Sequence, residues 1–360
     1  MSTTRILFSA SEEYFTAAER QIREEFPNAT VERLGPDLGG VAGEDLTLGR
    51  LAAVAAKRPF FFVQYLSEEI RRIRPADADL DKVADAAAEI AAERARTSDP
   101  LAVHSWVSGT SPFDYGSGQL QKRIGTALED LGHRIVRSGA DQIVTAAISR
   151  RGVSLGFTTS GDCVTEWPGG RVRLARPKEQ ISRAEFKLEE LLRETGDLLP
   201  SSGRAMDLGA SPGGWTRILR ERGLEVWAVD PAALDSRLTD DQRVHHERTT
   251  AGRFLESTAT RFDLAVSDMR MDPVLAARVM LDATARLGDG ALAVVTLKLG
   301  TRRPLETVRN AVDVLSRRYE MLLARQLQHN RHEITYVGRL RERNRPAGTS
   351  RRRRADDQWR

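Results

Sequence analysis

Apolar and polar residues follow two different patterns along this chain, and the change comes near residue 182. From residue 182 to residue 340, strand-like and helix-like segments alternate regularly, beginning with RAEFKLEELLRE (helix), RAMDLGA (strand) and GGWTRILRERG (helix). The strand segments are short, apolar and β-branched, and the helix segments carry apolar residues every three or four positions. This alternation predicts an α/β domain with a doubly wound, mostly parallel sheet.

Residues 1 to 168 mix strand and helix segments less regularly, which predicts one or two smaller α/β units. RILFSA, RPFFFVQYL, LAVHSWV, HRIVRSG, QIVTAAIS and VSLGFTTS are predicted strands, and ADADLDKVADAAAEIAAERART is a predicted helix. The stretch EWPGGRVRLARPKEQIS is rich in proline, glycine and basic residues, as expected of a connection. We therefore divide the chain into segments 1–80, 81–168, a basic linker 169–181, a large domain 182–340 and a tail 341–360.

Composition narrows the protein class. The chain has 360 residues, 40% hydrophobic and 29% charged, as in ordinary globular proteins. The single cysteine, Cys163, excludes an internal disulfide and a cysteine-cluster zinc site, and we expect no metal. The sequence contains neither an apolar run long enough for a membrane span nor a signal-peptide pattern at its start. A cytoplasmic protein with no membrane partner is therefore expected.

The basic residues are concentrated at the C-terminal end. The formal net charge is +4, yet residues 339–360 alone contain nine arginines and three acidic residues. This segment has almost nothing to bury, so we predict a disordered tail suited to holding phosphate groups. The alternative is a terminus that only improves solubility.

The stretch AMDLGASPGGW predicts a ligand site at the end of a strand. Glycines there permit positive φ and close approach of the backbone, and helix N-terminal amides attract negative groups. The stretch is neither a Walker A loop nor the dinucleotide pattern G-x-G-x-x-G. The next predicted strand ends in Asp230, where a ribose hydroxyl lies in nucleoside-binding sheets. S-adenosyl-L-methionine fits a nucleoside site without a diphosphate, and its predicted contacts are Asp207, Gly209, Ala210, Pro212, Gly213, Gly214, Trp215, Asp230 and Asp268.

Four charged residues stand at strand ends or on a preceding helix: Lys187, Asp268, Lys298 and Glu333. Lys298 is the most informative, because a lysine ending the apolar segment AVVTLKL is costly to bury unless it is paired. A buried lysine can also have its pKa lowered enough to act as a base. Each residue alone is most simply a solvated position, but two cations and two anions together predict a compact, charge-balanced site.

These segments resemble the FtsJ-type ribose 2′-O-methyltransferases. The resemblance rests on SRAEFKL, DLGASPGGW, SDM, LKLG and HEITYVGR, and it implies a catalytic tetrad of Lys187, Asp268, Lys298 and Glu333 in a Rossmann-like class I methyltransferase domain. RLARPKEQISRAEFKLEE and ARQLQHNRHEITY look closer to the bacterial branch that methylates a cytidine ribose of large-subunit ribosomal RNA. In that branch a ferredoxin-like segment and a THUMP RNA-binding domain come first, which implies those identities for segments 1–80 and 81–168.

The resemblance implies RNA as the partner, ribosomal RNA first, with no DNA expected. Phosphate contacts are predicted from the 81–168 domain, from the tail and from the basic residues Arg171, Arg173, Arg176, Lys178 and Arg183. Two segments depart from the family pattern. HHERTTAGRF stands where many members have an adenine-contacting acid, and MRMDP follows Asp268 in place of a proline-asparagine form.

Rival functions are left open by the sequence. The fold could belong to a non-catalytic RNA-binding or ribosome-assembly factor, or to a transfer RNA methyltransferase. Base methylation is disfavoured, because SDMRM replaces the Asn/Asp-Pro-Pro-aromatic motif and the catalytic segment has no nucleophilic cysteine. The oligomeric state and the modified nucleotide are not determined.

Overall fold

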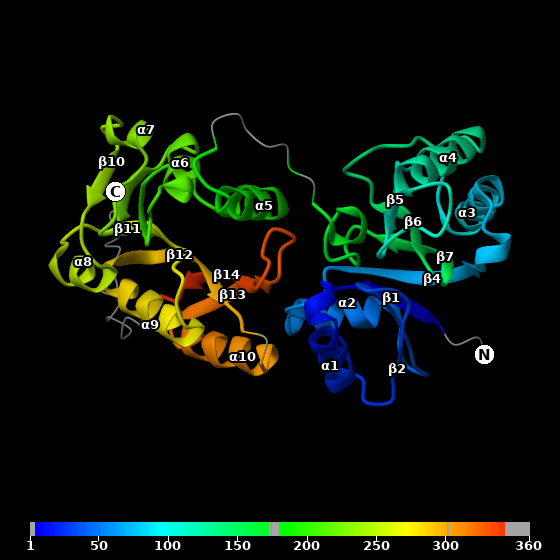
Figure 1. Ribbon diagram of the computed structural model, residues 1–360, viewed down its shortest axis with the longest axis horizontal. Coiled ribbons are helices and arrows are strands. Elements are labelled where there is room, and N and C mark those ends of the chain that lie inside the picture. The colour runs from blue at the N-terminus through cyan, green and yellow to red at the C-terminus, as the bar shows by residue number, and fades with distance from the viewer. Residues whose placement is uncertain (1–3, 173, 175–179, 301, 343–360) are drawn as a thin grey trace, which may run out of the picture.

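The computed structural model describes residues 4–172, 174, 180–300 and 302–342, and these form two halves with one seven-stranded sheet in each (Figure 1). The N-terminal sheet has the strand order β2-β3-β1-β4-β7-β6-β5. The C-terminal sheet has the order β10-β9-β8-β11-β12-β14-β13. Within the described ranges no helix is long and apolar enough to cross a membrane.

The N-terminal half is built on a mixed sheet, in which β5 and β6 pair parallel and the other pairs are antiparallel, together with four α-helices. Its strands are β1 Arg5–Ser9, β2 Thr30–Arg33, β3 Leu38–Ala42, β4 Tyr65–Ile73, β5 Leu101–Val107, β6 Gln142–Ser149 and β7 Gly152–Thr159. Its helices are α1 Phe15–Glu25, α2 Leu48–Lys57, α3 Leu80–Arg94 and α4 Ser117–Asp130. Strand β4 pairs with β1 on one side and with β7 on the other, so one sheet runs across the predicted division at residue 80. The division itself stays a prediction.

Two strand predictions for this half were wrong, and one strand was missed. The strand predicted at 58–66 begins only at Tyr65, because the apolar side chains before it pack into the core from a turn. The segment 133–139 forms no strand beyond a single bridge between Ile135 and Leu101. Strand β3 was missed because its two glycines obscure the apolar pattern, although Gly39 fits closely against the ring of Phe8.

The C-terminal half confirms the doubly wound, mostly parallel sheet. Its strands are β8 Arg204–Leu208, β9 Glu225–Val229, β10 Val244–Glu247, β11 Phe262–Ser267, β12 Leu287–Lys298, β13 Tyr319–Arg325 and β14 Glu333–Leu340. Its helices are α5 Glu185–Thr195, α6 Gly214–Glu221, α7 Ser236–Thr239, α8 Ala251–Ser257, α9 Pro273–Ala283 and α10 Pro304–Leu315. The first five strands in the sheet order run parallel to one another. Strand β14 pairs antiparallel with β12 on one side and with β13 on the other. Short 3-10 helices occupy Glu12–Tyr14, Pro75–Asp77, Pro168–Gly170, Gly196–Leu198 and Thr284–Arg286.

Helices cover both faces of the second sheet. Alternate residues of the central strands point to opposite faces: Val266 packs with α5 and α6, and Ala265 packs with α9 and α10. Burial on both faces explains why these strands read as continuous apolar runs.

The two halves are joined by more than the chain connection. The loop between β13 and β14 reaches the N-terminal half (Figure 1). There the Gln326 amide donates to the Phe61 carbonyl at 2.7 Å. The Arg325 guanidinium donates to the Val164 carbonyl at 2.7 Å, and apolar residues of both halves share one core cluster. The loop that leads to Glu333 is therefore held by the N-terminal half.

Candidate active site

The four predicted tetrad residues meet at the carboxyl-terminal edge of the second sheet. Asp268 follows β11, Lys298 ends β12, Glu333 begins β14, and Lys187 lies in the first turn of α5. The carboxyl ends of parallel β11 and β12 share one edge, and antiparallel β14 starts at that edge, so strand pairing alone brings three of the four together. The helix α5 supplies the fourth.

The tetrad forms a closed ring of ion pairs. Lys187 Nζ lies 3.1 Å and 3.0 Å from the two Asp268 carboxylate oxygens and 2.5 Å from Glu333 Oε1. Lys298 Nζ pairs with Asp268 and with Glu333. Each carboxylate therefore contacts both ammonium groups. Two positive and two negative charges give a cluster with no net formal charge, which lowers the cost of partial burial.

Burial and neighbouring charges shift the pKa values of the tetrad residues Asp268 and Lys187 in opposite directions. Burial by itself raises the pKa of Asp268, but the nearby charges of Lys298 and Lys187 outweigh it and hold the pKa below its usual range. Burial likewise works to lower the pKa of Lys187, and the charges of Asp268 and Glu333 raise it overall. Asp268 is accordingly ionised and Lys187 protonated near neutral pH.

Thr296 is a member of the site that the sequence analysis missed. Its hydroxyl donates to Asp268 Oδ1 at 2.6 Å and accepts from Lys298 Nζ at 2.8 Å. Thr296 lies two residues before Lys298 in β12, so both side chains point to the same face. This spacing of two within the strand was the signal that could have identified it.

The glycine loop occupies the neighbouring strand end. Gly209 has φ 82° and Gly213 has φ 110°, values that favour glycine. The amides of Gly209 and Ala210 donate to the Val229 carbonyl at 2.9 Å and 3.2 Å, which folds the loop back against β9. The Ser211–Pro212 peptide is cis, and α6 begins at Gly214.

Two acids predicted to bind the cofactor lie beside this loop, Asp207 buried within β8 and Asp230 half-buried after β9. Asp207 is buried in β8, accepts from the Thr216 hydroxyl at 2.7 Å, and burial raises its pKa to about 7. Asp230 follows β9 and accepts from the amides of Ser211 at 3.1 Å and Ala232 at 2.8 Å. Asp230 therefore ties the loop to the next strand end and is half-buried at the predicted ribose position.

Trp215 contributes packing through its side chain. The indole lies in the core between α5 and α6, and its Nε1 donates to the Ala184 carbonyl at 2.7 Å. The Trp215 side chain is therefore turned into the core, and the predicted cofactor contact of Trp215 can involve only its backbone atoms. Ala210 is buried, so its predicted contact likewise involves backbone atoms.

The loop 326–332, which precedes Glu333, is clamped by two buried side chains that the sequence analysis did not single out. Glu190 in α5 accepts from the amides of Gln328 at 2.7 Å and His329 at 2.9 Å, and from His329 Nδ1 at 2.6 Å.

The second of these side chains is that of Gln326, which donates to the carbonyls of Asn330 at 3.2 Å and Arg331 at 2.9 Å. Ser11 of the N-terminal half donates to Gln326 Oε1 at 2.8 Å. Glu190 is three residues from Lys187 in α5. The same helix therefore carries Lys187 and holds the loop that leads to Glu333.

The predicted RNA-binding residues are only partly placed. Arg171 pairs with Asp37, and Arg183 is exposed just before α5. Arg173, Arg176 and Lys178 lie outside the described residues, as does the tail from residue 343. Within the described residues there is no group of three or more side chains suited to a metal ion.

Comparison with known proteins gives concordant similarities. A family model described as FtsJ-like methyltransferase matches residues 180–328. A ribosomal RNA large subunit methyltransferase M from Laribacter hongkongensis is 32% identical over 366 residues, 93% of this chain and 96% of that protein. The protein of the same name from Halorhodospira halophila is 41% identical over 229 residues, 60% of this chain. The aligned part spans 65% of the length of the Halorhodospira halophila protein and 53% of that from Methylococcus capsulatus.

Solved structures show only remote likeness. TrmN from Thermus thermophilus covers 93% of this chain and 99% of its own at 14% identity, with a TM-score of 0.38. Aeropyrum pernix fibrillarin in complex with S-adenosyl-L-methionine covers 42% of this chain and 74% of its own at 18% identity, with a TM-score of 0.36. Likeness at this level does not distinguish one function from another.

Proposed function

Because this chain belongs to the ribosomal RNA large subunit methyltransferase M family, we propose that it methylates the 2′-hydroxyl of a ribose in ribosomal RNA, using S-adenosyl-L-methionine. A cytidine of the large-subunit RNA is the first candidate. The observation that carries the proposal is the closed Lys187–Asp268–Lys298–Glu333 ring beside a glycine loop. The relatives named ribosomal RNA large subunit methyltransferase M support it.

The residues of the loop fit S-adenosyl-L-methionine. Gly209 packs against Met269 so closely that a side chain at position 209 would collide with it. The positive φ and the close approach of Met269 both require glycine at position 209, so the turn after β8 lies tightly against the segment that follows β11. Asp230 would accept from ribose hydroxyls, and the amides at the start of α6 would face the cofactor carboxylate. When bound, the cofactor supplies a methyl group made electrophilic by its sulfonium.

The tetrad would orient the ribose and manage its proton. Lys298 Nζ contacts Asp268, Glu333 and Thr296, which accounts for the three hydrogens of an ammonium group. An entering 2′-hydroxyl has to replace one of these contacts. If Lys298 receives the hydroxyl proton, it must first pass one of its own to a neighbouring carboxylate. Such a shift leaves the cluster uncharged, which keeps its cost low.

The remaining members would have positioning roles. Lys187 and Glu333 would orient the 2′-hydroxyl, and Asp268 would hold both lysines in place. Alignment of the hydroxyl with the methyl group would supply much of the acceleration, because the methyl donor is already reactive.

The segment 81–168 would bind RNA as a THUMP-like domain, together with the linker and the tail. The halves are fixed to each other beside Glu333, so RNA held on one half would be presented to the tetrad on the other. A ribosomal RNA substrate implies that the protein works in the cytoplasm.

Transfer of labelled methyl groups from S-adenosyl-L-methionine tests the proposal. Ribosomal and transfer RNA would be incubated with the full chain and digested to nucleosides. We expect label in a 2′-O-methylated nucleoside of ribosomal RNA. Label on a base would contradict the ribose assignment, label only in transfer RNA would favour a transfer RNA methyltransferase, and RNA binding without transfer would favour an assembly factor.

A further inference from the structure

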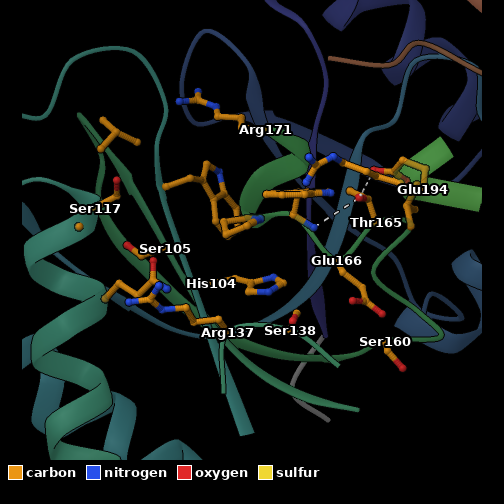
Figure 2. Close-up of a pocket in the computed structure, with 18 residues that line it drawn as sticks. His104, Ser105, Ser117, Arg137, Ser138, Ser160, Thr165, Glu166, Arg171 and Glu194 are labelled. Atoms are coloured by element: carbon orange, nitrogen blue, oxygen red, sulfur yellow. Dashed lines mark hydrogen bonds between the residues drawn. The ribbon is translucent and has the colours of Figure 1, made fainter. Parts of the chain in front are cut away.

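A cavity of about 940 Å³ opens where the N-terminal half meets the end of α5 (Figure 2), and no tetrad residue lines it. Its walls come from β5, the start of α4, residues 137–138, the segment 160–171 and the end of α5. Its volume is in the range of small-molecule and cofactor sites. Because α5 also carries Lys187, the cavity and the tetrad are linked by one rigid helix.

Three arginines line the cavity, and two of them form no ion pair among the described residues. Arg137, Arg171 and Arg193 line it, and Figure 2 shows Arg137 and Arg171 on different sides of the imidazole of His104. Arg171 is paired with Asp37, but among the described residues Arg137 and Arg193 have no ion pair. The lining acids do not neutralise them, since Glu194 pairs with Arg325 and Glu166 is exposed without a described partner. Two guanidinium groups that form no ion pair within the described ranges are suited to phosphate oxygens.

The cavity also offers an aromatic surface. Trp167 is half-buried in its wall, and among the described residues its ring is stacked on no other aromatic ring. The Trp167 amide donates to Thr165 Oγ1 at 3.3 Å, and its carbonyl accepts from the Gly170 amide at 2.8 Å, so its backbone is held. A partly exposed indole on a held backbone offers a stacking surface for a nucleobase.

The deeper wall contains polar groups and no buried charge. His104 Nδ1 lies 2.7 Å from the Tyr65 hydroxyl, and burial lowers the pKa of His104 to about 4, so the imidazole is neutral at physiological pH. Ser105 Oγ and Trp106 Nε1 are buried and have no hydrogen-bond partner within the described chain. The wall formed by β5 therefore carries polar groups without a formal charge, which suits an uncharged nucleobase.

We propose that this cavity binds a second, unpaired nucleotide of the RNA substrate, with its base on Trp167 and its phosphates on Arg137 and Arg193. The inference rests on the proposed function, because it assigns the cavity to the same RNA. Arg193 lies six residues after Lys187 in α5, which corresponds to about 9 Å along the helix. A nucleotide in the cavity would thus lie a few positions along the strand from the methylated ribose and fix the register of the RNA.

Binding of a fluorescently labelled 12-nucleotide single-stranded RNA, with the matching duplex as comparison, tests this. The full chain would be compared with Trp167→Leu, with the double variant Arg137→Gln/Arg193→Gln, and with Arg134→Gln, an exposed arginine near the cavity but outside its lining. We expect Trp167→Leu to weaken single-strand binding roughly fivefold or more without changing the salt dependence. The double variant should reduce the slope of log affinity against log salt by about 1.4.

Controls separate this proposal from the proposed function. Trp167→Phe should restore most of the single-strand binding, which shows that the loss in Trp167→Leu is not misfolding. In methyl transfer to ribosomal RNA, cavity variants should raise KM and leave kcat and cofactor affinity unchanged. Unchanged single-strand binding in both cavity variants, or equal losses for single strand and duplex, would overturn the proposal even where methyl transfer is intact. Altered RNA binding without any methyl transfer would support the cavity and count against the proposed reaction.

Discussion

Lys298 and Glu333 stand directly opposite each other in the antiparallel pair of β12 and β14, the last residue of one strand facing the first of the other. The two side chains form an ion pair at the edge of the sheet. Strand register thus fixes this half of the tetrad, and the pair closes the ring that Lys187 and Asp268 complete.

Replacing Lys298 should separate proton transfer from cofactor binding. We expect Lys298→Ala to lower kcat by about a hundredfold to ten-thousandfold, because the residue proposed to relay the hydroxyl proton is lost. The dissociation constant of S-adenosyl-L-methionine should change less than about twofold. Lys298→Arg keeps the charge but cannot release a proton, so it should also be inactive. Activity close to wild type in Lys298→Ala would remove Lys298 from the mechanism.

Replacing Asp230 should affect the cofactor first. Asp230→Ala removes the predicted ribose contact and two hydrogen bonds within the loop. We expect the affinity for S-adenosyl-L-methionine to fall roughly tenfold or more, measured by calorimetry. Asp240→Ala, an exposed acid ten residues further on, is the matched control and should bind normally. Equal affinities in the two variants would contradict the assignment.

Glu190 should act as a positioning residue for Glu333. Glu190→Gln keeps the shape of the side chain but weakens its charged hydrogen bonds to the amides of Gln328 and His329. We expect kcat to fall about tenfold with unchanged cofactor affinity, and the free energy of unfolding to fall by about 1–3 kcal/mol.

The pH profile of kcat distinguishes positioning from loss of stability. If Glu190 acts through Glu333, the profile of Glu190→Gln should shift relative to wild type at a temperature where both remain folded. A variant that is merely less stable would keep the wild-type profile.

His104 should make stability depend on pH. Burial lowers its pKa from 6.5 to about 4, so the unfolded chain takes up a proton between these values and the folded protein does not. The free energy of unfolding should therefore fall as pH drops from 6.5 to 4, by about 3 kcal/mol from this group. Denaturant titrations of wild type and His104→Gln across this range measure it. Identical pH slopes in the two proteins would contradict the prediction.

The amino-acid sequence by itself determined the doubly wound sheet and the candidates at its edge. Apolar, β-branched strands buried on both faces leave a strong local signal, and a charged residue such as Lys298 stands out at the end of such a strand. The glycines around Asp207 were recognisable for the same reason, because a tight turn restricts residue types.

Tertiary structure alone decided which polar residues support the site. Thr296, Glu190 and Gln326 act through partners distant in sequence, and their hydrogen bonds exist only once β11, α5 and the N-terminal half have packed together. Local pattern also failed where side chains pack without regular structure, as in the turn before Tyr65. The cavity around Trp167 was likewise not predicted, because its walls come from five segments that meet only in the folded chain.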